Sequence, residues 1–363
     1  MNILIDIGHP GHVHLLRNVY HQLIKNGHHI WVTVKDIPIA KTLLDKYNIV
    51  YIDIGKKRDS LIGKAISQLH YNLKVLQIVR NNGIEIGVGT SITLAHISKL
   101  SKMKSILLDD DDDEVQPLFV NYAHPFANTL LSPISLKGHR KKKGTIFYPG
   151  FHELAYLHPN RFIPDSDVLN EVGLKLGDVF FIMRFNVFKA HHDSGISGMS
   201  LQQKLKLIEL LEPYGRIFIT TEREIEPELK KYQIPVSPEK AHSLIFFATM
   251  FLGDSQTMTS EAAVLGTPAI RMNSFVGRIA YLEEEEHKYG LTYGFKPEQF
   301  EELVTKVNQL LKMPNLKEEW EFRRQKLLSD KIDVSSFFVW FIENYPNSIT
   351  QIQNTLEFWN KFK

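Results

Sequence analysis

Residues 251–271 read FLGDSQTMTSEAAVLGTPAIR and predict a strand, a polar turn, a helix and a second strand. Phe251 belongs to the first strand, and Gly266 can take the left-handed conformation that ends a helix. Pro268 then prevents the helix from continuing. An ordinary capped β–α–β connection would show the same pattern, so the polar residues inside the stretch decide what it indicates.

Four polar residues form the predicted turn, and a glutamate follows them inside the helix. Asp254 and Ser255 turn the chain, and Ser255, Gln256 and Thr257 present polar side chains and unpaired backbone N–H groups at the start of the helix. Unpaired amides and the helix dipole favour an anion such as a phosphate there. The carboxylate of Glu261, about one and a half turns further on, can accept hydrogen bonds from two ribose hydroxyls. The stretch therefore predicts a nucleotide site.

The length and composition indicate two globular domains. A chain of 363 residues is too long for one ordinary core, and 43% hydrophobic with 23% charged residues is typical of a globular protein. No apolar run approaches the ~20 residues of a membrane-spanning helix, and the first residues do not form a signal peptide. Because the chain has no cysteine, it has neither disulfides nor thiolate metal sites. We expect a cytoplasmic protein.

Strand and helix patterns alternate along the first half of the chain. Apolar β-branched runs predict strands, and apolar residues at helical spacing predict helices between them. The predicted strands are residues 2–7, 29–34, 49–54, 84–88 and 105–108, and the predicted helices are residues 12–25, 39–46, 93–101 and a long helix within 61–81. This alternation predicts a parallel sheet covered by helices on both faces, whose ligands bind beyond the carboxyl ends of the strands.

The pattern breaks at residues 131–149, where prolines, glycines and the basic run 139–143 predict a linker. A second alternating half follows. Its predicted strands are residues 179–184 and 216–220, and its predicted helices are residues 201–211, 227–232 and 242–249. Residues 334–363 predict aromatic, amphipathic helices. We therefore expect two domains, residues 1–140 and 141–335, followed by C-terminal helices in residues 336–363.

Three histidines occur in the turn after the first predicted strand, Gly8-His9-Pro10-Gly11-His12-Val13-His14. A glycine such as Gly11 lets the backbone approach a ligand closely, and the first helix begins here with its positive end. An imidazole that titrates near neutral pH can deprotonate a hydroxyl group. The alternative for His9, His12 and His14 is a helix-capping and packing cluster or an adventitious metal site.

Six consecutive acidic residues, 109–114, follow the fifth predicted strand. Carboxylates packed so closely repel one another, so some must face water, take up protons or have cations among them. A solvated acidic loop is the ordinary interpretation for most of them. We expect no metal in this run.

Arg184 ends the first predicted strand of the second half. A guanidinium can bind a diphosphate through two parallel hydrogen bonds and offset the charge on a departing nucleotide. The alternative is an ordinary surface arginine. Further candidates for the surroundings of the nucleotide are His191, His192, Asp193, Thr221, Glu222, Arg223 and residues 238–242.

The stretch 251–271 resembles the nucleotide-binding stretch of the GT-B superfamily, which holds nucleotide-sugar glycosyltransferases and the non-hydrolysing UDP-N-acetylglucosamine 2-epimerases. The resemblance implies an α/β fold of two Rossmann-like domains that face each other across a cleft. It also implies that Ser255, Gln256 and Thr257 hold the diphosphate and that Glu261 holds the ribose. The epimerases have a Gly-Gly pair where this chain has Gln256 and Thr257.

Two further features of the chain are similar to GT-B enzymes. Gly11-His12-Val13 matches three positions of the Gly-Gly-His-Val turn in the branch that transfers N-acetylglucosamine to a lipid-linked acceptor, which implies that His12 is the general base. In the 2-epimerases, the sheet edge after the fifth strand carries catalytic acids, which implies that Asp109 or Asp110 faces the sugar. The superfamily's C-terminal helices cross back onto the first domain. In detail, the chain looks most like an uncharacterised archaeal and bacterial family.

Charge is unevenly distributed, because residues 1–150 carry a net charge of +7 and the remainder −5. Residues 56–80 combine basic residues with more apolar positions than one buried stripe requires. These are Lys56, Lys57, Arg58, Lys64, Lys74 and Arg80, with Leu61, Ile62, Ile66, Leu69, Leu73, Leu76 and Ile78. Such a surface can lie against anionic lipid headgroups, as in GT-B enzymes that use lipid-linked acceptors. We expect peripheral attachment to the inner face of the cytoplasmic membrane, and the alternative is a two-sided core helix.

The resemblance implies a metal-independent glycosyltransferase. It would move a sugar from a nucleotide sugar, a UDP-sugar by expectation, to a hydroxyl acceptor in the synthesis of cell-envelope glycan or glycolipid, without a cofactor and without nucleic acid as a partner. Leaving-group stabilisation is the expected role of Arg184. A nucleotide-sugar epimerase or hydrolase is the first alternative, with the acidic run as its working part. A non-catalytic nucleotide-sugar-binding protein is the second.

Overall fold

The computed structural model describes residues 1–56, 61–185, 198–221, 225–234, 236–353 and 355–363. The chain forms two compact units. Unit 1 comprises Met1–Arg161 together with Lys331–Lys363, and unit 2 comprises Phe162–Asp330. The first division between them lies further along the chain than residue 140, where the sequence pattern placed it.

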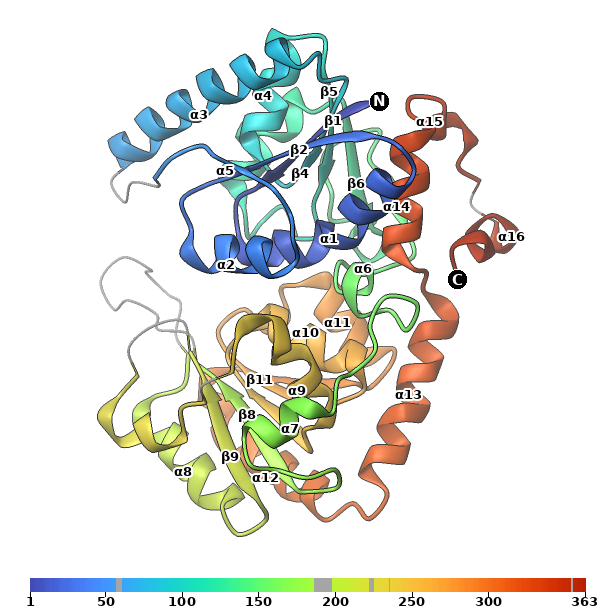
Figure 1. Cartoon of the computed structure of the whole chain (residues 1–363). Coiled ribbons are helices and arrows are strands. Elements are labelled where there is room, and N and C mark those ends of the chain that lie inside the picture. Colours follow the sequence, from blue (N-terminus) through green and yellow to red (C-terminus); the bar gives the residue numbers. More distant parts are fainter. Residues whose placement is uncertain (57–60, 186–197, 222–224, 235, 354) are drawn as a thin grey trace. The chain divides into compact units, whose positions relative to one another are not determined.

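Unit 1 is built on a seven-stranded sheet with the order β3-β2-β1-β4-β5-β6-β7 (Figure 1). Its strands are β1 (Asn2–Ile7), β2 (His29–Val34), β3 (Ile52–Asp53), β4 (Ile86–Gly89), β5 (Lys104–Leu108), β6 (Thr129–Pro133) and β7 (Ile146–Tyr148). All neighbouring strands pair in parallel, as predicted. The linker expected in residues 131–149 is wrong, because β7 lies inside it and pairs with β6.

Helices cover both faces of this sheet. They are α1 (Pro10–Lys25), α2 (Pro38–Lys46), α3 (Leu61–Asn81), α4 (Ile92–Leu100), α5 (Pro117–Tyr122), α6 (Leu154–Leu157), α14 (Val334–Glu343), α15 (Ser348–Gln351) and α16 (Leu356–Trp359). Short 3-10 helices are η1 (His124–Phe126), η2 (Ile134–Leu136) and η6 (Asn360–Phe362). Residues of α3, α4 and the α5–η1 segment share one core cluster with the sheet, whereas α1 contacts α2, α6 and α14.

The aromatic residues at the C-terminus pack within unit 1. The ring of Phe337 lies 5.5 Å from the ring of Tyr148, at the end of β7, and α14 contacts both α1 and α6. A Cβ atom at Gly150 would lie 2.5 Å from Cγ2 of Val334, so only glycine fits where the chain turns after β7. This packing fixes the loop that follows β7.

Unit 2 has a five-stranded sheet with the order β12-β11-β10-β8-β9 (Figure 1). Its strands are β8 (Phe180–Arg184), β9 (Arg216–Thr220), β10 (Met250–Gly253), β11 (Ala269–Met272) and β12 (Thr292–Phe295). Its helices are α7 (Asp167–Glu171), α8 (Leu201–Leu211), α9 (Ala241–Phe247), α10 (Gln256–Leu265), α11 (Ala280–His287), α12 (Phe300–Leu311) and α13 (Leu316–Asp330), with 3-10 helices η3 (Pro227–Tyr232), η4 (Pro238–Lys240) and η5 (Pro297–Gln299). The predicted strand–turn–helix–strand stretch is confirmed as β10, α10 and β11.

Two glycines of this stretch are required by geometry. A Cβ atom at Gly253 would lie 2.2 Å from the carbonyl oxygen of Arg184, so the close approach of β10 to β8 needs glycine. Gly266 ends α10 with φ 81°, the left-handed conformation predicted for it. Because β8 and β10 pair in parallel, both end at the same edge of the sheet, where α10 begins.

Candidate functional site

In each unit, polar side chains gather where strands end. In unit 1, Asp109 follows β5 and is buried. Its carboxylate accepts hydrogen bonds from Gln116 Nε2 at 2.5 Å and from His124 Nε2 at 2.7 Å, and it forms an ion pair with Arg140 Nη1 at 2.8 Å. A carboxylate held by so many donors is suited to support neighbouring groups. The predicted contact of Asp109 with the sugar stays a prediction.

A buried guanidinium neutralises part of the acidic run. Arg140 contacts both Asp109 and Asp113, and the backbone N–H of Lys141 donates to Asp113 Oδ2 at 2.7 Å. Asp112 and Asp113 are buried as well, so the solvated loop expected for most of the run does not form around them. Ligand atoms of Asp109, Asp113 and His124 lie close enough together for a metal ion. Arg140, however, already brings positive charge to two of these three residues.

Asp110 and Asp111 are only half-buried, and their surroundings shift their pKa values in opposite directions. Burial would raise the pKa of Asp110, but the charge and hydrogen bond of His152 outweigh burial and hold this pKa below its usual value. His152 Nδ1 lies 3.0 Å from Asp110 Oδ2. Burial, together with the charges of Asp110 and Asp109, raises the pKa of Asp111 to about 7. Asp111 can therefore gain or lose a proton near neutral pH.

His12 lies at the start of α1, and its hydrogen bonding bears on its chemistry. Its Nδ1 accepts a hydrogen bond from the backbone N–H of Gly8 at 3.2 Å. Burial, with further contributions from His9 and His152, lowers the pKa of His12 to about 3. A neutral imidazole that accepts at Nδ1 carries its proton on Nε2 and acts there as a donor. This geometry favours a hydrogen-bond donor, and the predicted role as a base stays a prediction.

The other residues of the histidine turn have structural contacts. His9 is the N-cap of α1, and its Nδ1 accepts from the N–H of Gly11 at 3.1 Å. His14 is buried, and its ring stacks on Tyr156 at 5.5 Å. These contacts agree with the capping and packing alternative for His9 and His14.

In unit 2, the turn into α10 has the predicted helix cap. Ser255 is the N-cap, and its hydroxyl accepts from the N–H of Met258 at 3.4 Å. Asn273 Nδ2 donates to the carbonyl oxygen of Asp254 at 3.0 Å, which fixes the turn. Asp254 is buried, Gln256 is half-buried and Thr257 is exposed. The first turn of α10 can therefore meet an anion from solvent.

Glu261 is buried inside α10 and contacts a histidine, a pairing that the sequence did not reveal. Its Oε1 lies 3.0 Å from Nε2 of His242, which belongs to α9. Only 6% of Glu261 and 3% of His242 are exposed. The contact gives His242 a definite partner, whereas the sequence suggested only that it could line a base pocket.

Arg184 lies at the same sheet edge as this turn. It ends β8, is half-buried, and its carbonyl oxygen accepts from the N–H of Asp254 at 3.1 Å. Thr221, which follows β9, is half-buried. The other candidates near the nucleotide, His191, His192, Asp193, Glu222 and Arg223, lie outside the described residues.

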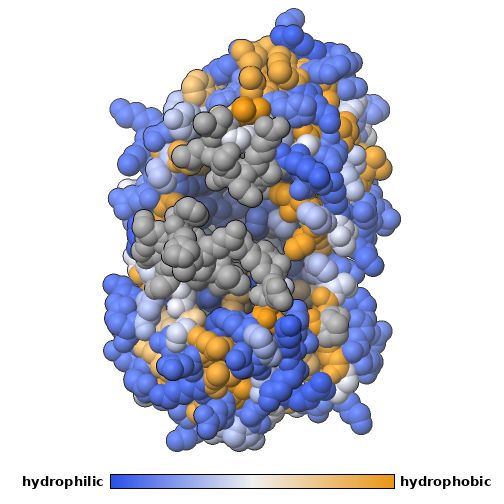
Figure 2. Space-filling view, turned by 90° about the vertical axis from the view of Figure 1, so that its left-hand side faces the viewer, coloured by the Kyte–Doolittle hydropathy of each residue, from blue (hydrophilic) through white to orange (hydrophobic). Residues whose placement is uncertain are grey.

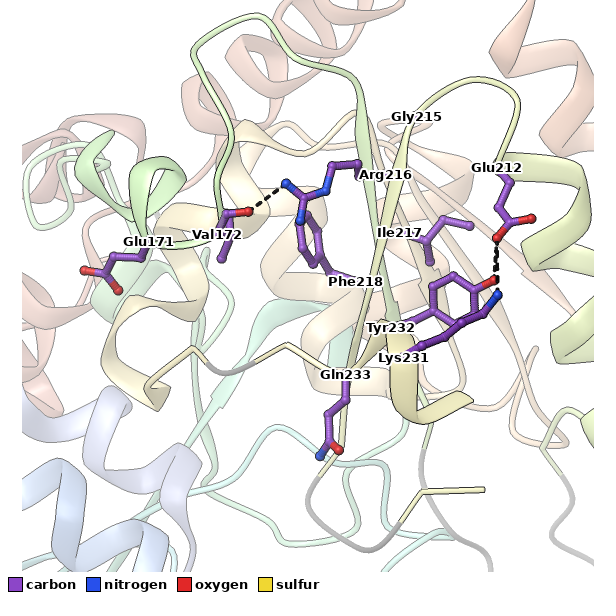
Figure 3. A pocket seen from close by; sticks show the side chains of 10 residues that line it. All are labelled: Glu171, Val172, Glu212, Gly215, Arg216, Ile217, Phe218, Lys231, Tyr232 and Gln233. Atoms are coloured by element: carbon purple, nitrogen blue, oxygen red, sulfur yellow. Dashed lines mark hydrogen bonds and ion pairs between the residues drawn. The ribbon is translucent and has the colours of Figure 1, made fainter. Parts of the chain in front are cut away.

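A cavity of about 510 Å³ opens in unit 2 at the amino end of β9 (Figure 3). Arg216 donates to the carbonyl oxygen of Val172 at 2.8 Å, and the hydroxyl of Tyr232 donates to Glu212. Within the described part of the chain, the walls contain none of the predicted site residues. Because parallel sheets bind ligands at the carboxyl ends of their strands, this cavity is not the candidate site.

Sequence reasoning missed several residues of unit 1, above all His152 and Arg140. His152 follows β7, which the sequence did not predict, and Arg140 lies in a basic run that suggested a solvated linker. No spacing signal links either residue to the acidic run. His152 and Arg140 come close to the acidic run only because β5, β6 and β7 pair side by side.

Comparison with known families and sequences gives a match without an assigned activity. A family model described as a protein of unknown function, DUF354, matches residues 1–288. An uncharacterised protein of Methanocaldococcus jannaschii is 21% identical over 304 residues, which is 79% of this chain and 86% of that protein.

Solved structures with a similar fold include both kinds of GT-B enzyme. The UDP complex of S. aureus MnaA has a TM-score of 0.68 at 11% identity, covering 97% of this chain and 98% of that chain. The UDP-GlcNAc 2-epimerase from Neisseria meningitidis bound to UDP-GlcNAc has a TM-score of 0.66 at 13% identity, covering 95% and 100%. The Streptomyces sp. SF2575 glycosyltransferase SsfS6 has a TM-score of 0.61 at 11% identity, covering 94% and 99%. The predicted GT-B-like α/β fold is confirmed.

Proposed function

Because the chain belongs to the DUF354 family, whose function is unknown, we propose its activity from its fold and its candidate site. We propose that it is a glycosyltransferase that moves a sugar from a nucleotide sugar, a UDP-sugar in the first instance, to a hydroxyl group of a glycan or lipid-linked acceptor in cell-envelope synthesis. The observation that carries the proposal is the arrangement in unit 2 of a capped helix N-terminus, a carboxylate on the same helix and an arginine at the adjacent strand end.

These three features match the parts of a nucleoside diphosphate. The N-terminus of α10, with Gln256 and Thr257 in its first turn, can hold phosphate oxygens. Glu261 lies deeper along the same helix, where its carboxylate can accept hydrogen bonds from ribose hydroxyls. Arg184 adds a positive charge beside the turn, where it can stabilise the diphosphate as it leaves.

The polar groups at the sheet edge of unit 1 can take part in proton transfer. In the transfer reaction, the oxygen of the acceptor forms a bond to the anomeric carbon, the bond from that carbon to the diphosphate breaks, and the hydroxyl proton passes to a base. Asp110 and Asp111 lie at the carboxyl edge of the sheet, and His12 can donate a hydrogen bond to a substrate oxygen. A base and an arranged donor are what such a displacement needs.

Asp111 supports a second candidate function, an epimerase or hydrolase of the nucleotide sugar itself. Epimerisation needs groups that both remove and return protons, and a carboxyl group with its pKa raised to about 7 can do either near neutral pH. Ligand atoms of Asp109, Asp110 and Asp111 lie within 4.8 Å of one another, so the acidic groups are concentrated at one place.

We also propose that unit 1 attaches peripherally to an anionic membrane. Among the described residues, no helix has the length and apolar character needed to cross a bilayer. Helix α3, however, exposes Ile66, Leu69 and Leu73 by 50%, 61% and 61%, although its other face is buried in the core. Figure 2, which views the side on which α3 lies in Figure 1, shows apolar side chains gathered at the upper end of this face. Lys56 and Arg80, exposed near the two ends of α3, add positive charge.

The test is an incubation of the purified protein with UDP-N-acetylglucosamine and other UDP-sugars, with and without an extract of membrane lipids and glycans. Release of UDP only when the extract is present supports transfer. Conversion of the UDP-sugar without the extract supports the epimerase or hydrolase. Binding without any conversion would replace both with a nucleotide-sugar-binding protein, and absence of binding would contradict the proposal as a whole.

A further inference from the structure

His152 is held beside Asp110 by the topology of the sheet. Asp110 follows β5, and His152 lies four residues after β7, two strands away at the same carboxyl edge. The N–H of Gly150 donates to the carbonyl oxygen of Tyr148 at 3.0 Å, and the close approach of Val334 to Gly150 leaves no room for a side chain there. The ring of Phe338 meets the ring of His152 edge to face at 6.4 Å. The imidazole is therefore fixed by its surroundings.

The hydrogen bond between the two residues sets the tautomer of His152. Nδ1 of His152 lies 3.0 Å from Asp110 Oδ2, and His152 is the side-chain hydrogen-bond partner that lowers the pKa of Asp110. Because a carboxylate can only accept a hydrogen bond, the proton of this contact belongs to Nδ1. In a neutral ring, the other nitrogen, Nε2, then presents a lone pair. This is the opposite tautomer to that of His12, whose Nδ1 accepts from Gly8. The two histidines are thus prepared for opposite tasks.

Several buried polar atoms of unit 1 have no hydrogen-bond partner among the described residues, and two of them bear on this pair. One is Nε2 of His152, a residue that is 8% exposed, and the other is the hydroxyl of Tyr148, which is fully buried. Burial and the charge of Asp110 both raise the pKa of Tyr148, so this hydroxyl lies within electrostatic range of the same carboxylate. Buried polar groups are nearly always paired, so two unpaired groups near one carboxylate call for a ligand or a functional reason.

We propose that Asp110 and His152 form the general base of the proposed transfer reaction. Nε2 of His152 takes the proton of the acceptor hydroxyl while that oxygen bonds to the anomeric carbon, and the bonding electrons of the broken bond leave with the nucleoside diphosphate. Asp110 holds the ring in the required tautomer and stabilises the imidazolium that forms. His12 donates a hydrogen bond and leaves proton removal to His152. This inference rests on the proposed function for its substrate.

The kinetic test compares variants of the full chain with wild type. His152→Gln and Asp110→Asn are expected to lower turnover by about 10²- to 10⁴-fold, the usual contribution of a general base, with UDP affinity within about twofold. The double variant should be no slower than the slower single variant, because the two residues act as a unit. The matched control is His139→Gln. His139 also pairs with an aspartate, since its Nδ1 lies 3.1 Å from Asp112 Oδ1, but its side chain is 60% exposed. This variant should keep wild-type turnover.

A spectroscopic readout separates this inference from the proposed function. Two-bond ¹⁵N–¹H NMR of the wild-type protein reports the tautomer of each histidine without a substrate. The spectrum should show His152 with its proton on Nδ1, and this pattern should change in the Asp110→Asn variant. A proton on Nε2 would overturn the inference whatever the activity. Wild-type turnover that survives in His152→Gln would also overturn it and leave the transferase proposal intact. If the protein shows the expected tautomer but no turnover, the transferase proposal is contradicted and the Asp110–His152 pair is still supported.

Discussion

The contact between Glu261 and the ribose can be tested with a ligand that lacks one hydroxyl. Wild-type protein should bind UDP more tightly than 2′-deoxy-UDP, because the carboxylate accepts a hydrogen bond from the 2′ hydroxyl. In Glu261→Ala this difference should fall to within about twofold. A comparison of two ligands in one variant cancels general effects of the substitution on the fold.

The magnitude follows from the burial of this carboxylate. Glu261 is 6% exposed, and one oxygen already lies 3.0 Å from His242. A hydrogen bond to a charged group contributes about 1.5–3 kcal/mol, so Glu261→Ala should weaken UDP binding by about 10- to 150-fold. The substitution also leaves the buried imidazole of His242 without its carboxylate, which costs about 1–3 kcal/mol of stability.

The assay is isothermal titration calorimetry with both ligands, accompanied by thermal unfolding. Glu319→Gln is the control, because it breaks a charge pair with Arg323 on α13 within the same unit, and it should leave both UDP affinities unchanged. Glu261→Gln should be folded and lose affinity less than the alanine variant. The reasoning is refuted if Glu261→Ala still prefers UDP over 2′-deoxy-UDP by the wild-type factor.

Three further predictions concern unit 1. The pKa of Asp111 is raised from 3.8 to about 7, so between these pH values the folded state holds more protons than the unfolded state, and the free energy of unfolding falls as the pH rises. Asp111→Asn should therefore raise the free energy of unfolding over wild type by up to about 4 kcal/mol at pH 8 and by much less at pH 4.5. Equal gains at both pH values in urea unfolding would contradict the shift. His12→Ala should lower turnover by about 10²-fold or more, while His12→Asn, which can still donate a hydrogen bond, should retain part of it; equal losses in steady-state assays would favour His12 as the base. Replacing Leu69 and Leu73 with serine should reduce sedimentation with anionic liposomes at low salt, whereas a wild-type protein that binds no liposomes at any salt would contradict the membrane surface.

The fold could be predicted largely because its signals are local. Apolar strands alternating with helices of regular spacing predicted both parallel sheets, and the Gly266–Pro268 signal placed the end of α10 correctly. The three-residue strand β7 was missed because it is short and lies among glycines, prolines and basic residues that indicate a linker. The domain boundary drawn at residue 140 followed from that interpretation.

The candidate site was harder to predict because its decisive contacts join distant residues. The sequence placed the acidic run at the right sheet edge, but it could not show that Arg140 enters the run from 27 residues further along and pairs with Asp113. Nor could it show that Asp109 accepts hydrogen bonds from several donors and that Asp110 lies next to His152. The histidine turn illustrates the same limit, since the tautomer of His12 depends on one backbone N–H of Gly8.

The most direct test of the central claim is a crystal structure of the protein soaked with UDP. The account predicts the diphosphate at the N-terminus of α10, in contact with Gln256, Thr257 and Arg184, and the ribose hydroxyls within hydrogen-bond distance of Glu261. UDP bound elsewhere, for example in the cavity beside Arg216, or no UDP bound at millimolar concentration, would contradict the assignment of unit 2 as the nucleotide-sugar domain.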